Sequence, residues 1–364
     1  MDHGRSDEEC RPFGQLGALV SEWMFLARVP PLATSHLFER PGMCSSTTSM
    51  EGKTVIVTGA TSGIGLETAM ELARRKARVI LACRDVEKAS AVAQLIRAET
   101  KQTAVVKKLV LDSFESVREF CDQVNRSEDR LDVLVNNAGL INCSTEFTYT
   151  KDGFEACFQA NHLSPVLLTL MLLEKLRKSA PSRIVNVSSD SHCIGDVSQL
   201  EAKARGRCTL RTPFAVYANS KLAMCLYTVA LADKIKNTGV TVNSLHPGLV
   251  QTPIASHGSF LRKLIFQVAA YTKGKTAVQG AQTTIQLAVD PALEKTTGEY
   301  FEECVRADER YRNPLLKDRA LAEEVFRASV KLVGFDQQLL ERAIGSPSNP
   351  CALQERAGSA SRAH

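Results

Sequence analysis

Short apolar segments alternate with longer amphipathic segments along residues 54–245. The short segments are rich in β-branched residues and end at glycine or polar residues, which is typical of buried strands. The longer segments repeat their apolar residues at helical spacing. We expect strands at Thr54–Thr58, Arg78–Cys83, Ala104–Leu111, Leu131–Val135, Arg183–Val187 and Val240–Leu245, and helices at Thr61–Arg75, Ala89–Thr100, Ser116–Val124, Asn161–Lys178 and Tyr217–Lys236.

This strand–helix alternation predicts one doubly wound α/β domain, with a mainly parallel seven-stranded sheet and helices on both faces. The domain should span residues 50–340 of the 364 in the chain. Residues 1–49 are rich in Pro, Ser and Thr and have poor periodicity, so we expect an extension that is poorly ordered or associates with a membrane. Residues 341–364 are expected to form a disordered tail.

Two apolar runs raise the question of a membrane span, which needs about 20 mainly apolar residues. The run from Leu163 to Leu173 is too short, and we interpret it as a buried core helix or a dimer helix. An N-terminal patch, Gly17–Val20 and Trp23–Ala27, is interrupted by Glu22. The patch is compatible with a degraded signal anchor or a membrane-surface helix, and a homodimer also stays open.

The amino-acid composition argues against several classes of protein. The 45 basic and 40 acidic residues are interspersed and give a net charge of +5, so no basic tract indicates nucleic-acid binding. The 11 cysteines include no Cys-x-x-Cys pair, which argues against a zinc ribbon or a disulfide scaffold. We expect a reduced chain in the cytoplasm or on the cytosolic face of an intracellular membrane, not a secreted protein. No metal is expected, because no cluster of metal-ligand spacing includes the histidines His162, His192, His246 and His257.

The first predicted strand leads into the glycine-rich sequence TGATSGIG at residues 58–65, which opens a helix. Glycines at this place let backbone N–H groups approach a pyrophosphate, and the helix N-terminus carries partial positive charge. The strand, turn and helix together make a Rossmann-like dinucleotide site the best interpretation, although the spacing is G-x-x-x-G-x-G. The expected cofactor-binding residues are Gly59, Thr61, Ser62, Gly63, Ile64 and Gly65.

The end of the second strand bears on the choice of cofactor. An acidic residue there would bind the ribose hydroxyls of NAD, whereas an arginine accommodates the 2′-phosphate of NADP. Cys83 occupies the usual acidic place and Arg84 follows it, so NADP(H) is favoured. Asp85 keeps NAD(H) open.

Four further motifs follow. An Asn-Asn-Ala-Gly loop containing Asn137, Ala138 and Gly139 comes after a strand, and Asn161 begins the long apolar helix. Ser188-Ser189 ends a strand, at the sheet edge where ligands bind. Each of these taken alone is more often a turn or a helix cap.

The fourth motif is Tyr217-Ala-Asn-Ser-Lys221, in which the tyrosine and the lysine share one helical face. The ordinary pKa of tyrosine, about 10, is too high for proton exchange at neutral pH. A neighbouring ammonium and a positive nicotinamide ring would lower that pKa. The motif therefore predicts acid–base chemistry at Tyr217.

In this order, TGATSGIG, NNAG, NHLS, NVSS, YANSK and HPGLVQT resemble the short-chain dehydrogenase/reductase family over residues 50–335. The phrases LACRD, SRIVNVSS, SKLA, VNSLHPG and TGEYF are most similar to the retinol dehydrogenase group. The resemblance implies hydride transfer between a nicotinamide cofactor and an alcohol or carbonyl compound, with the cofactor performing the chemistry.

The resemblance also implies individual roles. Tyr217 would exchange a proton with the substrate oxygen, and Lys221 would hold the nicotinamide ribose and lower the pKa of Tyr217. Ser189, rather than Ser188, would polarise the substrate oxygen, and Asn161 would hold a water in a proton relay to Lys221. Further cofactor contacts would come from Asp112 at the adenine and from Pro247, Gly248 and Thr252 at the nicotinamide end.

Two segments bear on the substrate. Residues 191–214 form a charged insertion between the serine and the tyrosine, and they form either a surface loop or part of the substrate mouth. Residues 254–275 are strongly apolar, which suggests either a lipophilic substrate or a core or membrane-facing helix. The apolar residues of this second segment include Phe260, Leu261, Leu264, Ile265, Phe266, Val268 and Tyr271.

The main hypothesis is an NADP(H)-dependent oxidoreductase of a hydrophobic alcohol, aldehyde or ketone. One alternative is a hydroxysteroid or general carbonyl reductase. Another is a non-catalytic NADP(H)-binding regulatory protein, against which the intact set of Asn161, Ser189, Tyr217 and Lys221 argues.

Overall fold

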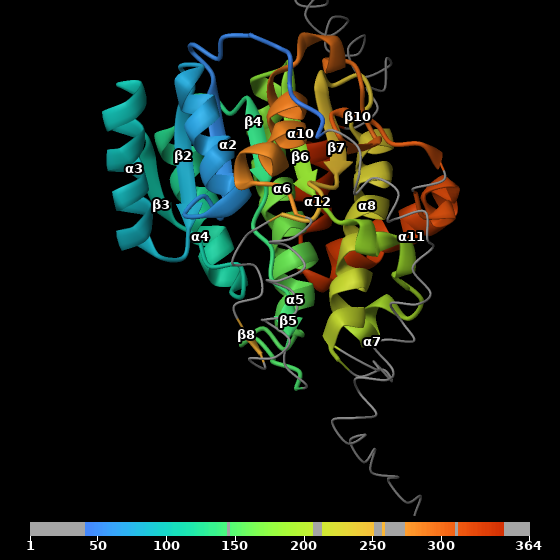
Figure 1. Cartoon of the computed structure of the whole chain (residues 1–364). Coiled ribbons are helices and arrows are strands. Elements are labelled where there is room, and N and C mark those ends of the chain that lie inside the picture. The colour runs from blue at the N-terminus through green and yellow to red at the C-terminus, as the bar shows by residue number, and fades with distance from the viewer. Residues whose placement is uncertain are drawn as a thin grey trace, which may run out of the picture.

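The computed structural model describes residues 41–143, 146–206, 213–250, 257–258, 274–309 and 312–345. In this part of the chain a central sheet has the strand order β10-β9-β7-β6-β4-β1-β2-β3 (Figure 1). All its neighbouring strands run parallel except β9 and β10, which are antiparallel. The strands are β1 (Thr54–Thr58), β2 (Arg78–Cys83), β3 (Val105–Lys108), β4 (Val133–Asn136), β6 (Ser182–Val187), β7 (Val240–Leu245), β9 (Tyr300–Glu302) and β10 (Val305–Arg306). This arrangement confirms the predicted Rossmann-like fold, with one short antiparallel strand added at an edge.

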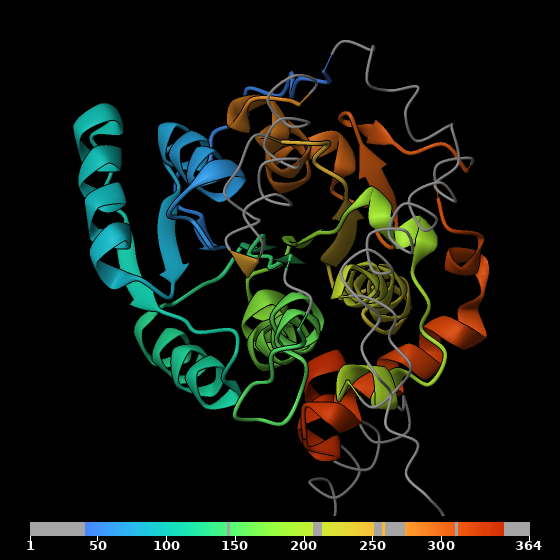
Figure 2. The ribbon, with the colours of Figure 1, turned by 60° about the horizontal axis from the view of Figure 1, so that its bottom comes forward.

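Helices cover both faces of this sheet (Figure 2). One apolar core lies under α2, α3 and α10, and the other under α4, α6, α8 and α11. The main helices are α2 (Gly63–Arg74), α3 (Val86–Thr100), α4 (Phe114–Ser127), α6 (Ser164–Lys178), α8 (Pro213–Lys234), α10 (Ala277–Val289), α11 (Arg319–Leu332) and α12 (Gln337–Ile344). The shorter elements are α5 (Ala156–Phe158), η2 (Gln159–Leu163), η3 (Asp190–Ile194), α7 (Leu200–Ala204), η4 (Pro291–Leu293) and η6 (Pro314–Lys317), and β5 (Asn142–Cys143) pairs with β8 (His257–Gly258).

The strand order reverses between β1 and β4, and ligands of such sheets bind at the carboxyl ends of the strands near this point. Both strands run in the same direction and pair directly, with Val57 beside Val135. The glycine-rich turn that follows β1 and the Asn-Asn-Ala-Gly loop that follows β4 therefore emerge side by side. The tertiary fold thus joins two motifs that are separated by about eighty residues of sequence.

The long apolar helix differs from its prediction at the N-terminal end. The helical segment begins at Ala156 and passes through a π-helical turn, η2, before it continues as α6. Pro165 lies just after this π-helical turn, inside the continuous helical segment, and has no N–H to donate to the turn before it. The segments Ala156–Lys178 and Phe214–Lys234 are long and apolar enough to cross a membrane. Most of the apolar stretch of each helix, however, is buried inside the protein. The apolar run is thus explained by core packing, in which α6 contacts α4 and α12.

Residues just outside the predicted domain also contact it. Gly42 N donates to Glu303 Oε2 and Cys44 N donates to Gln282 Oε1. Arg75 also donates to the carbonyl of Ser46. At the other end, α12 continues to Ile344, past the expected boundary at residue 340. Residues 1–40 and 346–364 lie outside the described part of the chain.

Candidate active site

The glycine-rich turn has a backbone that only glycine adopts easily. Gly59 and Gly63 have φ angles of +66° and +56°, in the left-handed region. At Gly65 a Cβ would lie 2.4 Å from the side-chain nitrogen of Asn137 and 2.4 Å from the carbonyl oxygen of Gly59. The turn is therefore packed directly against the loop after β4 and leaves no room for a side chain at this position.

Thr58, the last residue of β1, connects this turn to the loop. Its hydroxyl oxygen accepts from the backbone N–H groups of Asn137 and Ala138, at 3.0 and 2.9 Å. The Asn137 side chain donates to the Thr58 carbonyl at 2.8 Å. Thr58 was not among the expected cofactor-binding residues, although it is the first residue of TGATSGIG.

The N-terminus of α2 is suited to an anionic ligand. Ser62 is the N-cap residue, but its side chain forms no capping hydrogen bond, and the first turn of α2 contains no acidic residue. Unpaired N–H groups at a helix start attract phosphates. The turn, with Thr61 and Ile64 in it and Gly139 closing the facing loop, fits a dinucleotide pyrophosphate.

At the end of β2, three adjacent side chains have different environments. Cys83 is buried, which raises the pKa of its thiol to about 11. Arg84 is exposed. The Asp85 carboxylate caps α3 by accepting from Lys88 N at 3.0 Å, and this hydrogen bond lowers the pKa of Asp85. Asp112, expected at the adenine, is exposed in the turn after β3.

The two serines after β6 have separate tasks. The Ser188 side chain is buried, donates to the Lys221 carbonyl at 3.1 Å and accepts from Cys225 Sγ at 3.1 Å. Ser189 Oγ instead donates to Asp190 Oδ1 at 2.9 Å and forms a hydrogen bond with the Tyr217 hydroxyl. The structure therefore brings Ser189 to the tyrosine, while Ser188 anchors the strand to α8.

Tyr217 and Lys221 lie on α8, and both are almost completely buried. Lys221 Nζ donates to the carbonyl of Val187 at 2.9 Å and lies 5.5 Å from the centre of the Tyr217 ring. Burial raises the pKa of Tyr217, as does the charge of Asp190, while the Ser189 hydrogen bond opposes them. Burial also lowers the pKa of Lys221 to about 8.

The direction of the Tyr217 shift differs from the expectation, which was a lowered pKa. The physical reason is that removal from water penalises tyrosinate more than the nearby hydrogen bond compensates. The same burial lowers the pKa of Lys221, so its ammonium group loses a proton more readily. The predicted lowering would therefore depend on positive charge brought by a bound cofactor.

Asn161 lies within the π-helical turn, a feature that often occurs at functional sites. Its side-chain oxygen accepts from Leu140 N at 2.7 Å, and its nitrogen donates to Leu140 O at 2.9 Å and to Ser220 Oγ at 3.2 Å. The side chain thus joins the loop after β4 to the helix that carries Tyr217. Its water-relay role stays a prediction.

His192 and Asn313 form a support that the sequence analysis missed. His192 Nδ1 lies 2.8 Å from the Ser189 carbonyl, and its Nε2 accepts from Asn313 N at 3.3 Å. The Asn313 side chain donates to the His192 carbonyl at 2.9 Å. Burial lowers the pKa of His192 to about 4, so the ring is neutral. No sequence signal connects these residues, which are more than a hundred positions apart.

The insertion after Ser189 is fastened to α8. A Cβ on Gly195 would lie 2.6 Å from the Ala218 carbonyl oxygen, so the two backbones almost touch. Asp196 N donates to Asn219 Oδ1 at 2.7 Å. Of the insertion, residues 207–212 lie outside the described part.

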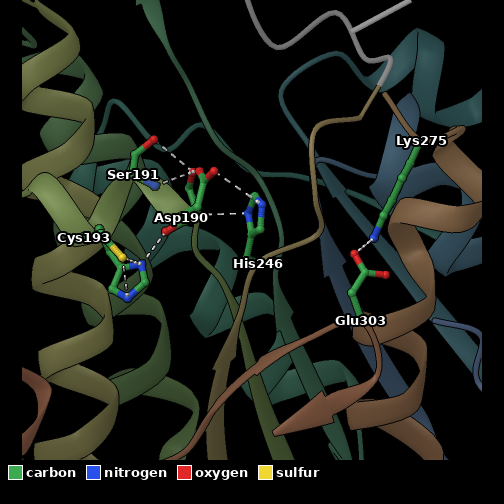
Figure 3. Close-up of polar contacts among 8 residues, drawn as sticks. Asp190, Ser191, Cys193, His246, Lys275 and Glu303 are labelled. Atoms are coloured by element: carbon green, nitrogen blue, oxygen red, sulfur yellow. Dashed lines mark hydrogen bonds and ion pairs between the residues drawn. The ribbon is translucent and has the colours of Figure 1, made fainter. Parts of the chain in front are cut away.

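The loop after β7 contains His246, Pro247 and Gly248, all partly buried (Figure 3). Gly248 has a φ angle of +86°, and a Cβ there would meet the side chain of Lys275, which forms an ion pair with Glu303. Thr252 and the apolar side chains expected over the substrate lie outside the described residues. Within the described part, no group of three or more His, Cys, Asp or Glu side chains is placed to hold a metal ion.

A glycine-rich turn at the switch point of a parallel sheet, with a serine, tyrosine and lysine at the carboxyl edge, defines a dinucleotide-dependent oxidoreductase. A family model described as short chain dehydrogenase matches residues 53–200 and 208–259. The chain belongs to the short-chain dehydrogenase family, and the predicted likeness to retinol dehydrogenases is also confirmed. Human retinol dehydrogenase 12 is 40% identical over 320 residues, which cover 88% of this chain and 98% of that protein.

Solved structures agree with this membership. An uncharacterised protein from Mycobacterium paratuberculosis superposes with a TM-score of 0.62 at 30% identity, covering 81% of this chain and 98% of that one. A short-chain dehydrogenase from Shigella flexneri, solved in complex with NADP, has a TM-score of 0.58 at 27% identity and covers 71% of this chain and all of that one. The present chain is thus similar to a protein that binds NADP in the same fold.

Proposed function

We propose that this enzyme uses NADP(H) to interconvert a hydrophobic alcohol with its aldehyde or ketone. The observation that most directly supports this proposal is the buried contact between Ser189 and Tyr217. Tyr217 lies four residues before Lys221 on the same helix. The retinol dehydrogenases to which the chain is similar are named for a hydrophobic alcohol. The substrate class is therefore proposed as a retinoid or another lipophilic alcohol.

The residues present fit the cofactor. The free N-terminus of α2 would receive the pyrophosphate, and Lys221 would hold the nicotinamide ribose. Arg84 is exposed at the end of β2, where it would face a 2′-phosphate. Asp85 is used as the cap of α3, which reduces its availability for ribose hydroxyls and supports NADP(H) over NAD(H).

The proton balance follows from Tyr217. A bound nicotinamide would supply the hydride in reduction and accept it in oxidation. In reduction, Tyr217 would give its hydroxyl proton to the carbonyl oxygen and be left as tyrosinate. In alcohol oxidation, tyrosinate at Tyr217 would take the hydroxyl proton of the substrate. Ser189 would orient the substrate oxygen, and the buried surroundings would exclude water. Tyr217 returns to its starting state by proton exchange with solvent.

The test is a panel of retinoid, steroid and aliphatic alcohols and aldehydes, assayed with NADP(H) and with NAD(H) on the wild-type and Tyr217→Phe enzymes. Loss of the proton carrier should lower kcat by about 10²–10⁴-fold. NADPH affinity should change little, because the phenyl ring preserves the packing. Activity that survives in Tyr217→Phe would overturn the assignment, and a preference for steroids would point to a hydroxysteroid reductase.

We also propose a location in the cytoplasm or on the cytosolic face of an intracellular membrane. Cys44, Cys83, Cys121, Cys225 and Cys304 are thiols that form no disulfide, as a reducing compartment favours. Fractionation of cells expressing the chain with and without residues 1–40 would show whether that segment associates with membranes.

A further inference from the structure

Asp190 follows Ser189 directly, and its side chain lies beside His246 (Figure 3). Asp190 Oδ1 accepts from Ser189 Oγ at 2.9 Å. On the other side, the Asp190 backbone N–H donates to His246 Nδ1 at 3.2 Å, and Asp190 Oδ2 lies 3.8 Å from His246 Nε2. The carboxylate therefore lies between the serine at the end of β6 and the histidine that opens the loop after β7.

A serine hydroxyl has a single proton to donate. While that proton is directed to Asp190, the Ser189 oxygen offers only lone pairs, one of which accepts from Ser191 N at 3.2 Å. The Ser189 hydrogen bond lowers the pKa of Tyr217 only when the serine proton is directed to the tyrosine oxygen, so directing that proton to Asp190 favours a tyrosine that keeps its own proton. A negative charge one residue from Ser189 has the same effect by Coulomb repulsion of tyrosinate.

We propose that Asp190, held by His246, is a positioning residue that orients the Ser189 hydroxyl and keeps Tyr217 protonated, and so favours carbonyl reduction over alcohol oxidation at neutral pH. The inference rests on the proposed function, because it assumes that Tyr217 carries the proton. The proposed effect is on the pH at which the oxidation rate rises and the reduction rate falls. The overall equilibrium of the reaction is unchanged.

The charges around Asp190 support this role. About half of the Asp190 side chain is exposed to solvent. Its partial burial pushes its pKa upward, but His246 and the Ser189 hydroxyl outweigh that and hold the pKa below its ordinary value. Asp190 is therefore ionised at neutral pH. Its charge in turn raises the pKa of Tyr217.

The other titratable groups near Asp190 and Tyr217 come from four elements. His192 and Cys193 on η3 are both neutral at pH 7, since burial lowers the pKa of His192 to about 4 and raises the pKa of Cys193 to about 12. Tyr300 on β9 is neutral, because burial raises its pKa. Tyr217 itself faces Cys157 on α5 and Lys221 on α8. Among these, Lys221 is the group whose positive charge would oppose Asp190.

The test compares pH profiles of kcat for alcohol oxidation and for carbonyl reduction in the full chain and in Asp190→Asn. Removing the charge should move both profiles to lower pH by about one unit, because Coulomb interactions across a few ångströms of partly buried protein are of that order. In the pH range where kcat of alcohol oxidation rises with pH, its value at a fixed pH should increase about tenfold. Reduction should begin to fall at a correspondingly lower pH.

Asp196→Asn is the matched control, because Asp196 lies a short way further along the chain, in the insertion, and pairs with Lys203 rather than Ser189. Its profiles should superpose on those of the wild type. A second variant, Asp190→Ser, keeps the test valid if the amide of the first disturbs Ser189. Titration of tyrosinate absorbance in the NADP complexes, corrected with Tyr217→Phe, should show the same downward shift without turnover.

Two outcomes are distinguishable. If the wild type is active and depends on Tyr217, but both Asp190 variants retain wild-type profiles and tyrosinate titrations, the role of Asp190 is refuted while the proposed function stands. If Tyr217→Phe retains activity, the proposed function itself fails.

Discussion

Ser188 and Ser189 are identical in chemistry and adjacent in sequence, yet their surroundings give them different tasks. Ser188 points into the core and binds the backbone of α8, whereas Ser189 faces Tyr217 and Asp190. β6 ends at Val187, but the backbone of Ser189 is still extended (φ −161°, ψ 155°), and successive side chains of extended backbone point to opposite sides. At the residue scale, then, the orientation of each side chain decides which polar group is available for chemistry.

A residue-scale prediction concerns Arg84. Arg84→Ala should weaken NADPH binding by about 10–100-fold, because hydrogen bonds to charged groups contribute about 1.5–3 kcal/mol. NADH binding should be nearly unchanged. Both affinities can be measured by cofactor fluorescence. Arg97→Ala is the control, since Arg97 is also exposed but lies in the last turn of α3, and an unchanged NADPH preference in Arg84→Ala would contradict the assignment.

At the scale of elements, the site is built where loops touch closely. The turn after β1 packs on the loop after β4 through Gly65 and Thr58, and the loop after β6 packs on α8 through Gly195. These contacts place backbone against backbone, so they have little freedom to adjust. The relative positions of cofactor loop, serine and tyrosine are therefore set by the packing of whole elements.

Gly65→Ala tests this packing. The added methyl group would overlap the Asn137 side chain and the Gly59 carbonyl, so we expect NADPH affinity to fall at least about tenfold, the size typical of overpacking costs of 1–3 kcal/mol. Calorimetric titration with NADPH measures the loss. Gly52→Ala is the control, because Gly52 has a positive φ angle but no atom within 4 Å of the added Cβ; equal losses in both variants would attribute the effect to general destabilisation.

At the scale of the whole molecule, burying a single titratable group makes stability depend on pH. Glu155 is completely buried, caps α5 by accepting from Phe158 N at 2.8 Å, and binds Ala204 O through its own backbone N–H. Burial raises the pKa of Glu155 to about 7. Because the folded pKa exceeds the unfolded value, this group stabilises the fold most below about pH 4.5, and the contribution is lost as the pH rises through about 7.

Glu155→Gln should remove this dependence while keeping an acceptor for the cap. The difference in unfolding free energy between variant and wild type should shift in favour of the variant between pH 4.5 and 7, by at most about 3 kcal/mol. Urea unfolding at several pH values measures it. Glu115→Gln, at an exposed ion pair with Lys151, should show little change over this range, and parallel curves for Glu155→Gln and wild type would exclude the buried carboxyl as the cause.

The sequence by itself determined the class of fold, the glycine turn and the Tyr217–Lys221 pair, because hydrophobic period and residue spacing along one element are local properties. It missed β9 and β10, the start of the long helix at Ala156 and the attachment of residues 41–49, since these depend on pairing with distant segments. Only the tertiary structure decided that burial raises the pKa of Tyr217, and that Asp190, His192 and Asn313 surround Ser189. Those properties arise from solvent exclusion and from contacts across elements, which no local pattern encodes.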